Sequence, residues 1–79
     1  MSKLFDEIVA RSGLANMIGP GTLQRALAAV GVSVPELAQK QDYERALPQL
    51  KARMAIYLSP DDLEKRVAAI AALLATSPD

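Results

Sequence analysis

Apolar residues recur every three or four positions along most of this chain, the spacing that places them on one face of an α-helix. Glycine or proline interrupts this pattern at residues 13, 19–21, 31, 35, 48 and 60. The helix formers Ala, Leu, Glu, Lys, Gln and Arg also outnumber the residues that favour strands. The pattern therefore predicts an all-α fold, a compact bundle of four to five short helices.

The ends of the first two helices are marked by capping residues and glycines. Ser2 can cap the start of a first helix over about residues 3–12. Gly13 can end this helix, because glycine readily adopts the left-handed conformation found after many helices. A second apolar stripe is ended by Gly31. Its start has two solutions, with either Pro20 as the first helical residue or Thr22 as the cap.

The middle of the chain predicts one short and one longer helix. Ser33-Val34-Pro35-Glu36 has the form of a capping box, which predicts a helix of two turns toward Lys40. Asp42 can then cap a fourth helix, whose stripe extends to Tyr57 and contains Pro48. An interior proline removes a backbone bond, so this helix either bends at Pro48 or begins just before it. The stripe keeps its phase there, which favours a bend.

The last helix has the clearest start. In Ser59-Pro60-Asp61-Asp62, serine is the cap, proline the first helical residue, and the aspartates lie at the positive end of the helix dipole. The aspartates precede Lys65 and Arg66 by four residues, which predicts two ion pairs. This joint predicts that the last two helices form an antiparallel hairpin. We expect one domain over residues 1–79, with residues 76–79 as a frayed tail.

The composition limits the catalytic and metal-binding side chains that the chain can use. The chain has no Cys and no His, which excludes disulfides, thiolate metal sites and the commonest proton-transfer side chain. Its hydroxyl residues stand mostly where helix caps belong. We therefore expect no enzyme, no cofactor and no metal site.

Charge and hydropathy indicate which partners and which compartment the chain suits. Nine basic residues balance nine acidic ones, so no global field attracts nucleic acid or anionic lipid. No long apolar run of a signal peptide or a membrane span is present. These features predict a cytoplasmic protein without a membrane partner.

Two segments raise DNA binding as an alternative. Residues 22–40 resemble the helix-turn-helix family, with an apolar first helix, a glycine at the turn and an apolar anchor six residues later. The resemblance implies that Gln39 and Lys40 face a DNA major groove. The turn at residues 18–21 resembles the hairpin of helix-hairpin-helix proteins, which bind the DNA backbone, with Arg25 as the basic residue that follows it. The alternative function is a small DNA-binding regulator.

The surplus of apolar residues favours a different function. A domain of this size buries only about 60% of the surface of its unfolded chain, so part of the apolar surface should stay exposed. We expect one edge, formed by Met17 and Ile18 with Ile56 or Leu73, to bind a partner. The sequence thus predicts a non-catalytic interaction or assembly module whose partner is another protein or a second copy of this chain.

Overall fold

The computed structural model describes residues 3–76. These residues form helices α1 (Lys3–Ser12), α2 (Gly19–Ala29), α3 (Lys40–Met54) and α4 (Pro60–Thr76), with one turn of 3-10 helix, η1 (Pro35–Leu37), and no strand. The predicted all-α bundle is confirmed. The cap expected at Ser2 lies outside the described residues. Of the frayed tail expected at residues 76–79, Thr76 belongs to α4 and residues 77–79 lie outside the described range.

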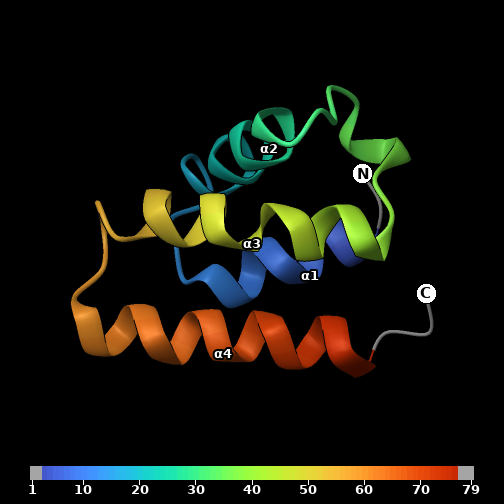
Figure 1. Ribbon diagram of the computed structural model, residues 1–79. Coiled ribbons are helices and arrows are strands. Elements are labelled where there is room, and N and C mark those ends of the chain that lie inside the picture. The colour runs from blue at the N-terminus through green and yellow to red at the C-terminus, as the bar shows by residue number, and fades with distance from the viewer. Residues whose placement is uncertain (1–2, 77–79) are drawn as a thin grey trace.

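Helix α3 packs against α2 and α4, and α1 packs against the same two helices. In Figure 1, α2 and α4 lie on opposite sides of α3, and α1 lies behind, where it packs against both α2 and α4. Helices α3 and α4 run side by side in opposite directions and are joined by residues 55–59. The predicted antiparallel hairpin is confirmed.

All four α-helices contribute apolar side chains to one core. The fully or nearly fully buried members are Phe5, Ile8, Leu23, Ala26, Leu27, Tyr43, Ala46, Leu50, Met54, Ile70 and Leu74. Within its helix, each of these residues lies three or four positions from another, as the apolar pattern of the sequence predicts. Full burial of one large aliphatic side chain stabilises a fold by about 1.5–3 kcal/mol, so this core is the main source of stability.

Glycines end α1 and α2 as predicted. Gly13 and Gly31 have φ angles of 72° and 93°, in the left-handed region that glycine adopts without steric cost. After α2, the Val32 amide donates to the Leu27 carbonyl at 2.9 Å, and the Gly31 amide donates to the Ala28 carbonyl at 3.1 Å. These two bonds form a Schellman motif, which satisfies carbonyls that the end of α2 leaves without helical partners.

The start of α2 differs from both predicted solutions. The helix begins at Gly19, so Pro20 is its second residue. Thr22 is not a cap, because its hydroxyl lies inside the helix and donates to the Ile18 carbonyl at 2.8 Å. No side-chain cap is present, because the N-cap residue is Ile18, whose side chain has no acceptor. The Gly19 amide donates instead to the Ala15 carbonyl, and Pro20 has no amide proton to satisfy.

The capping box predicted at Ser33 is wrong. The helical segment there is the three-residue η1, which follows Val34 and has no side-chain cap. Val34 would have to be helical for Ser33 to act as the cap, but it precedes Pro35 and is extended, with φ −118° and ψ 101°. The proline ring disfavours helical backbone in the residue before it, which explains the failure of the motif.

Helix α3 begins before both predicted starts. Its N-cap is Gln39 and its first residue is Lys40, so Asp42 lies inside the first turn instead of capping it. The helix also runs through Pro48, so a start just before that proline is wrong, and the bend stays a prediction. Pro48 and Glu44, the residue whose carbonyl loses a helical donor there, are both exposed. Water can therefore replace the missing bond.

The start of α4 agrees with the sequence, but its ion pairs do not. Helix α4 begins at Pro60, and the Ser59 hydroxyl accepts a long bond of 3.4 Å from the Asp62 amide. Within the described residues, neither aspartate forms an ion pair with Lys65 or Arg66. These side chains are exposed, where the entropy of holding two long side chains together offsets most of the attraction.

Candidate interaction surface

Large apolar side chains are exposed in the connecting segments of this bundle. Among residues 3–76 they are Met17, Ile18, Val34, Leu37, Ile56 and Tyr57. They divide into two groups, because α2 and α3 run antiparallel (Figure 1). The start of α2 and the end of α3 meet at one end of the pair, and the segment that links the two helices lies at the other.

The first group, which we call the joint surface, consists of Met17, Ile18, Ile56 and Tyr57. Met17 is 96% exposed, Ile56 76% and Tyr57 50%. Ile56 and Tyr57 line a small hollow, of about 50 Å³, together with Thr22 of α2. Because residues from both segments line this hollow, the start of α2 lies beside the end of α3, and the Thr22 hydroxyl bonds to the carbonyl of Ile18 in the preceding turn. The structure thus brings three of the four predicted partner-binding residues to one end of the molecule.

The fourth predicted residue, Leu73, does not belong to this surface. It is partly buried and packs against the core. It also lies near the end of α4, about 20 Å along the helix axis from Pro60, where α4 leaves the joint. The prediction for Leu73 did not anticipate this packing.

Tyr57 was expected in the stripe of the fourth helix but lies on the joint surface. Helix α3 ends at Met54, and the chain continues in a turn in which the Tyr57 amide donates to the Met54 carbonyl at 2.9 Å. Beyond the helix end, the three-to-four-residue periodicity no longer sets the direction of a side chain. The ring of Tyr57 is consequently half exposed.

Two arginines line the same hollow as Ile56 and Tyr57. They are Arg25 of α2 and Arg53 of α3. Neither forms an ion pair, and the Nε of Arg53 is buried without a hydrogen-bond partner within the described part of the chain. A buried donor without an acceptor costs about 1–3 kcal/mol, and more when the group is charged. The hollow therefore combines two positively charged side chains with apolar walls, and one of these side chains has a buried donor without a partner.

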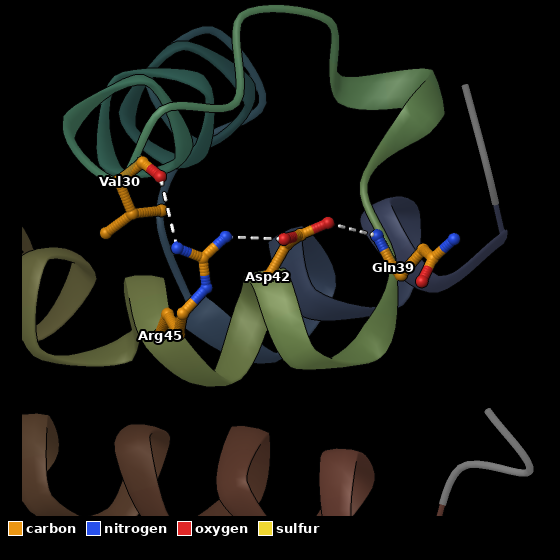
Figure 2. A network of polar contacts seen from close by, with 4 residues as sticks. All are labelled: Val30, Gln39, Asp42 and Arg45. Atoms are coloured by element: carbon orange, nitrogen blue, oxygen red, sulfur yellow. Dashed lines mark hydrogen bonds and ion pairs between the residues drawn. The ribbon is translucent and has the colours of Figure 1, made fainter.

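The opposite end of the α2–α3 pair has a different arginine environment, shown in Figure 2. Arg45 pairs with Asp42 at 2.7 Å and donates to the Val30 carbonyl, after the last turn of α2, at 3.4 Å. The other carboxylate oxygen of Asp42 accepts the Gln39 amide at 2.8 Å. The Gln39 amide, and secondarily the Arg45 guanidinium, lower the pKa of Asp42 below its ordinary value of 3.8. This network connects the first turns of α3 to the end of α2.

A groove of about 260 Å³ lies beside this network. Its walls come from residues 31–34 with Leu37 and Asp42. Leu37 is 73% exposed and Val34 44%. Both carboxylate oxygens of Asp42 are engaged by Arg45 and Gln39, so the groove offers mainly apolar contact.

The structure separates the residues of the DNA-binding alternative. Arg25 lines the hollow at one end of the α2–α3 pair, whereas Gln39 and Lys40 lie at the start of α3. Along α3, Lys40 is about 20 Å from the hollow residue Arg53. The second helix expected within residues 22–40 is the single turn η1, which is too short to act as a recognition helix in a major groove.

Other classes of site find no support in residues 3–76. Within that range, no group of three or more acidic side chains is placed to hold a metal ion. None of the helices described there is long and apolar enough to cross a membrane. No family model, curated protein or solved structure matches the chain. Fold and surface together define a small all-α bundle with an apolar, arginine-lined surface at one end.

Proposed function

We propose that this protein is a non-catalytic interaction or assembly module that binds a protein partner through the joint surface. The observation that supports this most is the convergence of exposed apolar side chains with unpaired arginines. Isolated apolar side chains are ordinary on protein surfaces, but clusters of them mark contact sites. Exposed Met, Tyr and Arg are also typical of the cores of protein interfaces.

The chemistry of the chain supports a non-catalytic role. It contains neither His nor Cys. Several of its hydroxyl groups are engaged with neighbouring backbone: Ser12 donates to the Val9 carbonyl at 2.6 Å, Thr22 to Ile18, and Thr76 to Ala72. A hydroxyl bound in this way has no base beside it to activate it as a nucleophile. A cytoplasmic location is part of the same proposal, because a chain without cysteines suits a reducing compartment.

The test compares two matched surface variants. Ile56→Ser with Tyr57→Ser removes apolar area from the joint surface, and Leu37→Ser with Val34→Ser does the same at the far groove. All four residues are exposed, so circular dichroism should show the same helix content in both variants. We expect self-association in sedimentation, or capture of a partner from cell extract, to be lost in the first variant and kept in the second. A wild-type protein that stays monomeric and captures nothing would contradict the proposal.

Binding to DNA remains the alternative to be tested on the same material. The distance between Arg25 and the pair Gln39 and Lys40 argues against it, because the three cannot form one recognition element. We expect no binding to duplex DNA even at low salt. Binding that weakens steeply with salt and is lost in Arg25→Ala or Lys40→Ala would replace our proposal with a DNA-binding regulator.

A further inference from the structure

Two groups of unpaired charge flank the apolar centre of the joint surface. On the α2 side, Arg25 and Arg53 line the hollow beside Ile56 and Tyr57. On the α4 side, the first turn of the helix carries Asp61 and Asp62, which are exposed and follow Ile56 and Tyr57 closely in the chain. Figure 1 shows α2 and α4 on opposite sides of α3, so the helix that carries Arg25 and the helix whose first turn carries the two aspartates lie on opposite sides of the helix that carries Arg53.

This arrangement is complementary to a copy of itself. A two-fold axis through the apolar centre would place Ile56 and Tyr57 of one copy against the same residues of the other. The arginines of each copy would then face the aspartates of its partner, so the attractive contact occurs twice. Arrangements in which like charges face each other are disfavoured, which selects this orientation.

Within residues 3–76, none of these arginines and aspartates forms an ion pair. The ion pair of the described residues joins Asp42 to Arg45, at the far end of α3. Both guanidinium groups are therefore available to a carboxylate from outside, and the buried Nε of Arg53 has no hydrogen-bond partner within the described residues. A hollow of about 50 Å³ accommodates a small group such as a carboxylate, but not a large side chain.

We propose that the protein forms a two-fold symmetric dimer in which an aspartate carboxylate of the second copy, Asp61 or Asp62, enters the arginine-lined hollow of the first. This inference rests on the proposed function, because it names the occupant of the same joint surface. The apolar centre excludes water from the contact, and the two sets of charge pairs fix its orientation.

The test is a charge exchange between copies. One variant carries Arg25→Glu and Arg53→Glu, and the other carries Asp61→Lys and Asp62→Lys. In sedimentation velocity we expect the wild-type protein to dimerise and each variant to have its dimer dissociation constant raised more than about tenfold, because like charges then face each other. An equimolar mixture should regain the dimer, and native mass spectrometry should find one copy of each variant in it.

Matched controls keep the result interpretable. Lys40→Glu with Lys51→Glu reverses two charges on α3 outside the hollow and should leave the dimer unchanged. Arg25→Glu alone changes an exposed residue, so it tests the hollow even if replacement of Arg53 impairs folding. We expect a partial loss of dimer from it, with an unchanged circular dichroism spectrum.

The outcomes separate this inference from the proposed function. A wild-type monomer at all concentrations overturns the dimer, and so does a mixture that fails to regain it. Capture of a different protein that is lost in Ile56→Ser with Tyr57→Ser would then leave the interaction module standing with another occupant. A dimer that persists in both charge-reversed variants but is lost in that serine variant would show that the joint surface forms the interface without the aspartate contact.

Discussion

The two ends of the α2–α3 pair contain the same residue types in opposite states. At one end, Arg45 binds Asp42 and the Val30 carbonyl, and the carboxylate also accepts a backbone amide. At the other, Arg25 and Arg53 lie beside exposed apolar side chains, and neither forms an ion pair within residues 3–76. The first end satisfies its polar groups from within the chain, whereas the second leaves charge and apolar area uncovered. Folding alone explains the first arrangement but not the second.

The largest predicted effect tests whether both ends depend on one core. Leu27 is fully buried on α2, between the two ends. Leu27→Ala should lower the free energy of unfolding by about 2–5 kcal/mol, through lost transfer energy and the cavity left behind. Denaturant unfolding measures it, and Leu37→Ala, at an exposed site, should change stability by less than about 0.5 kcal/mol. Equal effects from the two substitutions would contradict the observed core.

Alanine substitutions at the two ends of α2 should change the stability by smaller amounts and in opposite directions. Gly31 has a φ of 93° and open space around it, so Gly31→Ala should cost about 1–2 kcal/mol through backbone conformation alone. Gly21 lies inside the first turns of α2 with no atom within 4 Å of an added Cβ. Gly21→Ala should therefore stabilise the helix, by up to about 1 kcal/mol. Thermal unfolding of both variants checks the signs, and a stabilising Gly31→Ala would refute the left-handed cap.

Sequence patterns predicted helix ends best where one residue sets the backbone. Gly13 and Gly31 end α1 and α2 as expected, because the left-handed region is open to glycine for local steric reasons. The short helix predicted from Ser33 was wrong because two local rules competed at residues 33–36, and the constraint of Pro35 on Val34 prevailed over the capping box. The end of α3 carried no glycine or proline before Pro60, so periodicity placed Tyr57 in the helix.

The candidate surface was predicted only in part for a different reason. The exposure of Met17, Ile18 and Ile56 followed from a count of apolar residues that a small core cannot bury. Arg25 and Arg53 are 28 positions apart and line one hollow only because of the tertiary fold, so no local sequence pattern predicts their proximity. Long-range neighbours of this kind depend on how α2 packs against α3, which a single sequence does not specify.

A third prediction concerns the N-cap of α4, next to the joint surface. The Ser59 hydroxyl accepts the Asp62 amide at 3.4 Å, which is long for a hydrogen bond. Ser59→Ala should therefore cost only about 0.5 kcal/mol, at the lower limit for loss of a cap. Thermal unfolding measures the change, and Ser59→Asp, which keeps an acceptor at the same place, should lose less. A loss larger than that of Gly31→Ala would show that Ser59 does more than cap α4.

The smallest predicted change in stability concerns the network of Asp42, Arg45 and Gln39, and it depends on pH. The Gln39 amide and then the Arg45 guanidinium lower the pKa of Asp42 from 3.8, so the folded state favours the ionised carboxylate. The stability that this provides is present above the unfolded-state pKa, about 4, and is lost as the pH falls through the lower folded-state value.

Thermal unfolding of the wild-type protein and of Asp42→Asn should consequently differ at pH 7 and converge below the folded-state pKa. Acid titration of the other carboxylates lowers both melting temperatures alike, so the difference between the two proteins isolates Asp42. The difference is expected to be small, because the Arg45 side chain is 58% exposed and water screens the pair. A difference that persists unchanged into strong acid would mean that the carboxylate charge does not hold this end together. The contrast between the two ends would then rest on the uncovered surface alone.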